Sequence, residues 1–410
     1  MLLIKNKTNI IFNSPLIMLF TLIVPILISV KGSGYKPTSF SEITITVLVY
    51  LILILSFTKR LSQAQSIFCL TLLSYLAVQI CLSIISNSIL AAFESLVLHN
   101  RYIPVSVIVF NLLNLKKQRV LTDLLIIMGV MLAWLTVIKV LQEPTMLFTL
   151  YAASEGGYQR QGSIFPNTNM AGTYFTIILI LFLPRIPVNK WYKTVATYII
   201  ACFPLLLSIM LSFSRRAWLF LLIAVSLQFL LGKRKIKFVE WLLMLVIISA
   251  LSQIDFVSII GRFLLIFDGG YESNSLRAAS SGQFYKLLSK SPELFLGGGG
   301  VGSYGPASIA ISGDKYRQID VYYSQLHLEF GLIGLLGYFA VFSVVSSTAI
   351  YFYMKRKIVE EYRDVYLAYI LAFLGLYFFA LAGSTPITYP LNFFQWYIAG
   401  VLLSRGYKVS

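Results

Sequence analysis

Long apolar segments constrain this chain more than any other feature of its sequence. A helix needs about 20 apolar residues to cross the hydrocarbon core of a bilayer. The chain is 58% hydrophobic and only 12% charged, whereas soluble proteins carry about 25% charged residues. We therefore predict an all-α, polytopic membrane protein whose 410 residues form one transmembrane domain. About twelve segments fit a membrane span, at residues 9–30, 43–58, 65–86, 89–115, 120–141, 169–185, 192–211, 217–231, 238–258, 320–350, 363–382 and 389–404.

The segment at residues 89–115 is the least regular of these predicted spans. Four residues interrupt its apolar run: Glu94, His99, Arg101 and Pro104. Charged side chains are expensive inside a bilayer, and proline removes a helical hydrogen bond. We expect a broken helix here, or a re-entrant piece followed by a short span.

Basic residues between the segments predict the orientation of the chain, because cytoplasmic loops of membrane proteins are enriched in lysine and arginine. If all twelve spans are real, every basic cluster falls on one side, and both termini are cytoplasmic. The net charge of +17 then reflects membrane anchoring and is no sign of nucleic-acid binding. The clusters are Lys5/Lys7, Lys59–Arg60, Lys116–Arg119, Arg185–Lys193, Lys233–Lys237, Lys355–Lys357 and Arg405/Lys408.

Two long loops fall on the opposite, outer side, at residues 142–168 and 259–319. A connection as long as the second is uncommon and usually functional. Part of it is amphipathic as a helix, since Leu276, Phe284 and Leu287 lie near one face. We expect a large outer loop that is partly helical and lies at the membrane surface.

Several arginines lie on this outer side, where the orientation rule disfavours them. Arg215 and Arg216 occupy a short turn in LSFSRRAWLF, and Arg160, Arg262 and Arg277 lie in the long loops. The planar fork of a guanidinium matches phosphate oxygens and stays charged when partly desolvated. The group predicts a binding site for the phosphate or diphosphate of a lipid. Alternatively, these side chains extend to lipid headgroups or pair with outer acidic residues.

Four stretches, in this order, resemble motifs of the bacterial O-antigen polymerase and O-antigen ligase superfamily. They are RQGSIFPNTNMAGTYF, LSFSRRAWLF, SNSLRAASSGQFYKLLSKSPELFLGGGGVGSYG and DVYYSQLHLEFGLIGLLGYF. Together they cover roughly residues 158–350, whereas the first 140 residues match only in hydropathy. The resemblance implies a helical bundle similar to the C-type glycosyltransferases, with a large helical periplasmic loop. It also implies a metal-independent enzyme without a cofactor that uses sugars linked to polyprenyl diphosphate.

By position, the resemblance assigns Arg215 and Arg277 to the diphosphate of the substrate. Arg160, Arg216 and Asn169 lie in the same motifs and are further candidates for substrate binding. Asn169 equally suits a helix cap. Tyr323 is a candidate for stacking on a sugar ring, although tyrosines are common at membrane interfaces.

One departure from the family pattern favours polymerase over ligase. Ligases carry a His-Asn pair eleven residues before the glycine that corresponds to Gly331, and Asp320 stands there in this chain. Asp320 is the first candidate for a general base and His327 the second. Alternatively, Asp320 caps the helix and His327 is a buried packing residue. Glu329 is an intramembrane acid and a functional suspect, unless it only forms hydrogen bonds within the bundle.

The glycine-rich stretch GGGGVGSYG, residues 297–305, lacks the Lys-Ser/Thr of a nucleotide-binding loop. We interpret it as a flexible turn.

The resemblance therefore implies a polymerase that joins oligosaccharide repeat units linked to undecaprenyl diphosphate. The reaction would occur on the periplasmic side of the bacterial inner membrane, with membrane lipid around the protein and polyprenyl diphosphate as the leaving group. A chain-length regulator remains open as a partner. The alternatives are a ligase that transfers glycan to the lipid A core, a flippase for lipid-linked oligosaccharides, and a teichoic-acid or capsule polymerase.

Overall fold

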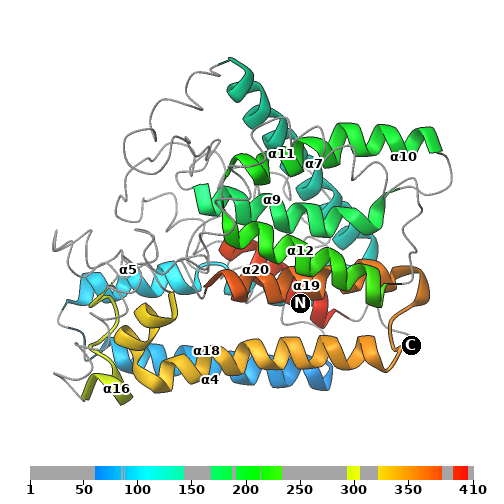
Figure 1. The fold of residues 1–410 in the computed structure, drawn as a ribbon. Coiled ribbons are helices and arrows are strands. Elements are labelled where there is room, and N and C mark those ends of the chain that lie inside the picture. The colour runs from blue at the N-terminus through cyan, green and yellow to red at the C-terminus, as the bar shows by residue number, and fades with distance from the viewer. Residues whose placement is uncertain are drawn as a thin grey trace, which may run out of the picture.

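The computed structural model describes residues 61–84, 86, 88–142, 168–186, 191–212, 214–232, 293–304, 322–380 and 391–404. These residues form helices joined by turns, and no strand occurs among them (Figure 1). Three predicted spans, at 9–30, 43–58 and 238–258, lie outside this part of the chain, as does most of both predicted outer loops.

Every predicted span that falls on described residues coincides with one helix or with a run of adjoining helices. Within the described part of the chain, five helical segments are long and apolar enough to cross a bilayer, which identifies an α-helical membrane protein. The total of twelve spans stays a prediction. The five segments are α4 (Gln63–Ser83), α7 (Leu115–Gln142), the run of α10 (Trp191–Thr197), η2 (Tyr198–Cys202) and α11 (Phe203–Leu211), α18 (Tyr322–Met354), and α19 (Arg363–Ala380) with its preceding turn. Shorter apolar helices are α9 (Thr168–Phe182), α12 (Arg215–Leu231) and α20 (Leu391–Leu403).

The irregular fourth span is broken, as its sequence predicts. Helix α5 (Ile89–Asn100) ends at Asn100, with Arg101 as its C-cap. Helix α6 (Ile103–Leu112) begins two residues later with Pro104 in its first turn. Proline is tolerated in a first turn because the amide it lacks would have no helical partner there. Neither piece alone is long enough to cross a bilayer, so the two together replace one span.

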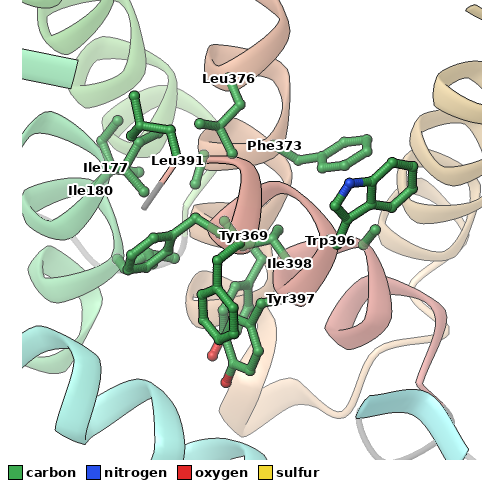
Figure 2. Packing of buried hydrophobic residues seen from close by; sticks show 14 of the residues in the cluster. Ile177, Ile180, Tyr369, Phe373, Leu376, Leu391, Trp396, Tyr397 and Ile398 are labelled. Carbon is green, nitrogen blue, oxygen red and sulfur yellow. The ribbon is translucent and has the colours of Figure 1, made fainter. Parts of the chain in front are cut away.

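Helix α19 lies at the centre of the bundle, in contact with α9, α12, α18 and α20. Figure 2 shows its Tyr369, Phe373 and Leu376 among side chains of α9 and α20. In the most apolar window of this segment 72% of the residues are buried, against 28% for α4. Helix α19 is therefore a core helix, and α4 is a peripheral one.

Helix α4 lies along α18 at the edge of the bundle (Figure 1). Its inward face buries Phe68, Leu72 and Tyr75, whereas Leu70 and Leu73 are exposed. Lipid tails are as apolar as these exposed side chains, so this face suits contact with the bilayer.

The helix ends that carry basic clusters meet at one end of the bundle. Gln65, in the first turn of α4, donates from Nε2 to the carbonyl oxygen of Leu403 at the end of α20 (3.1 Å). Arg119, in the second turn of α7, donates to the hydroxyl of Tyr362 just before α19 (3.2 Å). We call this the basic end. It groups ends that the sequence places on one side of the membrane.

A network of hydroxyl groups joins three helices at the basic end. Thr122 Oγ1 of α7 lies 2.5 Å from the hydroxyl of Tyr369 on α19 and 2.6 Å from that of Tyr397 on α20. The Tyr397 hydroxyl donates to the backbone oxygen of Gln118 (3.0 Å), and Arg185 Nη2 donates to Tyr369 (3.2 Å). Buried, mutually bonded polar groups of this kind fix the relative positions of the helices that carry them.

Helix α18 is kinked near its other end, where Gly331 has a φ of 66°. The glycine-rich turn after α16 (Glu293–Gly297) packs into this kink (Figure 1). Gly299 N–H donates to the carbonyl oxygen of Leu328 (2.7 Å). Gly298, Gly300 and Gly302 also have positive φ angles, which glycine adopts without the steric penalty of other residues. The turn predicted at residues 297–305 is thus present over its described part, residues 297–304, but it is fixed against α18 by these contacts and not flexible as predicted.

We predict that Gly331→Ala destabilises the protein. A methyl group on Gly331 would collide with the carbonyl oxygen of Leu296, and φ is positive there, which by itself costs a non-glycine residue about 1–3 kcal/mol. Thermal unfolding in detergent measures the effect. Gly297→Ala is the matched control, because an added methyl group there meets nothing within 4 Å. Equal melting temperatures for the two variants would contradict the packing of this turn into the kink.

Candidate functional site

Arg216 lies in the first turn of α12, at the end of the bundle opposite the basic end. Helix α12 begins at Arg215 after the N-cap residue Ser214. The side chain of Arg216 is partly buried, and its Nη1 donates to the carbonyl oxygen of Phe379 (3.1 Å). Phe379 lies in the last turn of α19, so this arginine joins the start of α12 to the end of the central helix.

Tyr323 reaches the same turn of α19 from a different helix. It is the second residue of α18, and its hydroxyl donates to the carbonyl oxygen of Tyr377 (3.0 Å). Tyr377 precedes Phe379 by two residues. Two residues that the sequence proposed for substrate binding, Arg216 and Tyr323, therefore bind neighbouring carbonyl groups at the end of α19.

Asn169 lies at the same end, in the first turn of α9. Gly172, three residues later, allows the turn before α12 to approach closely. A Cβ atom on Gly172 would lie 2.5 Å from Ser212 Oγ and 2.8 Å from Ser214 Cβ. The start of α9 and the start of α12 are thus in contact.

His327 holds α16 against α18. Its ring packs on that of Phe295, with centroids 5.3 Å apart, and its Nε2 lies 2.9 Å from the carbonyl oxygen of the same residue. A carbonyl oxygen only accepts, so Nε2 carries the proton in this hydrogen bond. These contacts support the interpretation of His327 as a packing residue. Its role as a base stays a prediction.

The positions of four predicted site side chains are not described by the structure. Asp320, Arg277 and Arg160 lie outside the described residues, as does the side chain of Arg215, whose backbone begins α12.

A fully buried carboxylate, that of Glu329, lies on the adjacent part of α18. It accepts hydrogen bonds from Ser95 Oγ of α5 (2.8 Å, to Oε2) and from Gln325 Nε2 (3.1 Å, to Oε1). His99 Nε2 of α5 lies 3.6 Å from Oε2. Glu329 therefore forms hydrogen bonds within the bundle, which was one of the two interpretations of its sequence position. We call His99 and Glu329 the buried dyad.

Tyr322 extends this arrangement to the start of α18. Its hydroxyl lies 3.0 Å from His99 Nδ1, and only 2% of the residue is exposed. Ser95 and His99 on α5 are four residues apart, as are Gln325 and Glu329 on α18, so each pair lies on one helix face. The two polar faces meet between otherwise apolar helices.

Sequence reasoning found Glu329 but missed its partners. The sequence marked His99 only as one of four residues that interrupt the fourth span. A histidine and an acid in one apolar segment indicate a buried polar contact, because polar groups inside a membrane need partners. This pattern points to His99 but does not show which helix His99 contacts.

The arrangement does not resemble a metal centre. Among the described residues, no three histidine, cysteine or acidic side chains converge as metal ligands. The polar atoms instead form two neighbouring groups. One is the junction of Arg216 and Tyr323 with the end of α19, and the other is the buried dyad.

The chain matches no protein-family model and no curated protein. What the fold defines is an α-helical membrane protein. The likeness to the O-antigen polymerase and ligase superfamily rests on the four sequence motifs.

We predict that Glu329→Leu destabilises the protein strongly. The change leaves the Ser95 hydroxyl and the Gln325 amide without their acceptor, at a cost of about 1–3 kcal/mol for each buried group. Glu329→Gln retains an acceptor oxygen and costs less. Thermal unfolding in detergent measures both, with the exposed Glu361→Leu as the control. A Glu329→Leu protein as stable as the wild type would contradict the burial of this carboxylate in a hydrogen-bonded cluster.

Proposed function

We propose that this protein is a membrane glycosyltransferase that polymerises oligosaccharide repeat units carried on polyprenyl diphosphate. The sugar hydroxyl of one unit attacks the anomeric carbon of another. A new carbon–oxygen bond forms, and the bond to the diphosphate breaks with its electron pair on the leaving group.

The observation that supports this proposal is the convergence of the four motifs. The start of α9 contacts the turn before α12, and Arg216 of α12 binds the end of α19. Tyr323 of α18 binds the same turn of α19, and the glycine-rich turn packs on α18. The described parts of these four stretches therefore form a series of contacts at one end of the bundle, in which the end of α19 joins α12 to α18, an arrangement that suits a shared binding site.

Arginine chemistry fits the charge that this reaction develops. The departing diphosphate gains negative charge in the transition state, and preorganised cations in a water-poor site stabilise such charge. Arg215 begins α12, whose N-terminus carries a partial positive charge that also favours an anion. We assign the diphosphate to Arg215 and Arg277, with Arg160, Arg216 and Asn169 as neighbours in binding.

We place the basic end in the cytoplasm and the converging motifs on the periplasmic side of an inner membrane. Contacts between α4 and α20 and between α7 and the start of α19 group the basic clusters at one end, which agrees with the enrichment of lysine and arginine in cytoplasmic loops.

A flippase for lipid-linked oligosaccharides is the second candidate. The break between α5 and α6 and the kink at Gly331 favour it, because transporters bind substrates and ions where membrane helices are discontinuous. Such a protein would move the lipid-linked glycan across the bilayer without making a bond.

We predict that Arg215→Ala and Arg277→Ala each lower glycan transfer by about 10²–10³-fold, the range for removing one donor that stabilises transition-state charge. Purified protein in detergent would receive a synthetic polyprenyl-diphosphate repeat unit with EDTA and without ATP. A gel would show whether a ladder of lengthening glycans forms.

Arg119→Ala is the matched control, since Arg119 is an exposed arginine at the basic end. We expect it to retain the ladder. Transfer only to added lipid A core would indicate a ligase. Transport into vesicles without transfer would indicate the flippase and overturn the proposal.

A further inference from the structure

The glycine-rich turn after α16 has a backbone whose φ angle alternates in sign. Gly298, Gly300 and Gly302 have φ angles of 74°, 91° and 76°, whereas φ is negative at Gly299 and Val301. Alternation of this kind turns successive N–H groups toward one side of the backbone and forms a concave nest that binds anions. Glycine adopts the positive angles without strain, which accounts for its use at these three positions.

The first two N–H groups of the turn fix it in place. Gly298 N–H donates to the carbonyl oxygen of Leu294 (3.1 Å), and Gly299 N–H donates to that of Leu328 (2.7 Å). The turn is thereby anchored to α16 on one side and to α18, just before its kink, on the other. These bonds hold the backbone that follows in one conformation.

The next three N–H groups, those of Gly300, Val301 and Gly302, donate to no acceptor on the part of the chain that the structure describes. All three residues are buried, and Val301 is 0% exposed. Roughly 90% or more of the buried backbone N–H groups in proteins are paired, so three consecutive unpaired donors indicate an acceptor supplied by a ligand. Several N–H groups on one concave surface match the oxygens of a phosphate group.

The start of α5 lies against the same turn. A Cβ atom on Gly302 would collide with the carbonyl oxygen of Ala91 in the first turn of α5. Ser86 Oγ, just before this helix, donates to the carbonyl oxygen of Val301 (2.8 Å). The N-terminus of a helix carries a partial positive charge, which favours an anion nearby. Ile89, the first residue of α5, is 85% exposed, so the turn borders the surface of the bundle on this side.

The buried carboxylate of Glu329 does not occupy the unpaired donors. It accepts hydrogen bonds from Ser95 and Gln325. Ser95 lies four residues after Ala91 on α5, which is about one helical turn. The N–H groups of the glycine-rich turn therefore remain available to a different anion.

We propose that the N–H groups of Gly300, Val301 and Gly302 bind phosphate oxygens of the lipid-linked substrate. This inference rests on the proposed glycosyl transfer, and it adds a backbone site to the arginines assigned to the diphosphate. Preorganised N–H donors stabilise an oxyanion without a charged side chain. A turn that is already fixed also loses little freedom when its ligand binds.

The test removes one N–H group and leaves every side chain in place. Incorporation of the α-hydroxy acid analogue of valine at position 301 converts the amide of Val301 into an ester, in which an oxygen atom replaces the N–H. Gly302→Ala would confound folding with binding, because its methyl group collides with Ala91. Calorimetric titration of the full chain in detergent measures its affinity for inorganic diphosphate. We expect the ester to weaken this affinity by about 10–100-fold, the range for one hydrogen bond to a charged group.

An ester at Ser303 is the matched control. The N–H of Ser303 already donates to the carbonyl oxygen of Gly300 (3.2 Å), so it is not one of the proposed donors. We expect this protein to bind diphosphate with the affinity of the wild type. Thermal unfolding of both ester proteins without ligand compares their stability separately from binding.

Hydrogen exchange of the unmodified protein tests the same site without any substitution. Inorganic diphosphate should slow the exchange of the peptide that contains Gly300, Val301 and Gly302, because bound donors exchange slowly. A short polyprenyl diphosphate should slow it at lower concentration than inorganic diphosphate, since the lipid-linked substrate is the proposed ligand.

Diphosphate binding that the Val301 ester leaves unchanged, or exchange in this peptide that diphosphate does not slow, would overturn the nest and leave the proposed function standing. Equal affinity for the inorganic and the lipid-linked diphosphate would overturn the lipid as the ligand and indicate a site for free phosphate. A protein that binds diphosphate at the turn but transfers no glycan would overturn the proposed function, and the anion site would stand.

Discussion

The hydrogen bond from Gly299 N–H to the carbonyl oxygen of Leu328 is the contact on which the proposed site most depends. A kink in a membrane helix removes hydrogen bonds from the backbone, and no water in the hydrocarbon region replaces them. The glycine-rich turn supplies a donor to α18, and His327 supplies another to the carbonyl of Phe295. These contacts hold the glycine-rich turn against the kink at Gly331. Tyr322 and Tyr323 are consecutive residues at the start of α18, so their side chains point about 100° apart around the helix and reach different partners. Tyr322 faces His99, and Tyr323 binds the end of α19.

The described part of the molecule combines a rigid apolar core with polar groups gathered at its two ends. Helix α19 joins both, since Tyr369 belongs to the hydroxyl network of the basic end and Phe379 accepts the hydrogen bond from Arg216. Apolar packing along the helix holds these ends a fixed distance apart. The polar groups at both ends of α19 therefore keep a fixed spacing. This spacing holds Arg216 at one end of an otherwise apolar bundle.

The sequence predicted those features of the fold that depend on one segment at a time. Apolar length predicted the helices, and Pro104 with its charged neighbours predicted the break between α5 and α6. Loop charges predicted that the N-termini of α4 and α7 would lie at the same end of the bundle as the C-terminus of α20. Pairings between distant segments were not predictable, because a single sequence does not show which helices touch. Ser95 and Glu329 are 234 residues apart, and the sequence pattern of neither helix shows that the two are in contact.

The hydroxyl network at the basic end has a mechanical consequence for the whole bundle. Thr122, Tyr369 and Tyr397 tie α7, α19 and α20 together there, and the bond from the Tyr353 hydroxyl to Leu231 O ties α18 to α12 (2.6 Å). The breaks in α5–α6 and α18 both lie toward the opposite end. The network therefore keeps the cross-section of the bundle constant in the leaflet that holds the basic end, and this preserves the permeability barrier there.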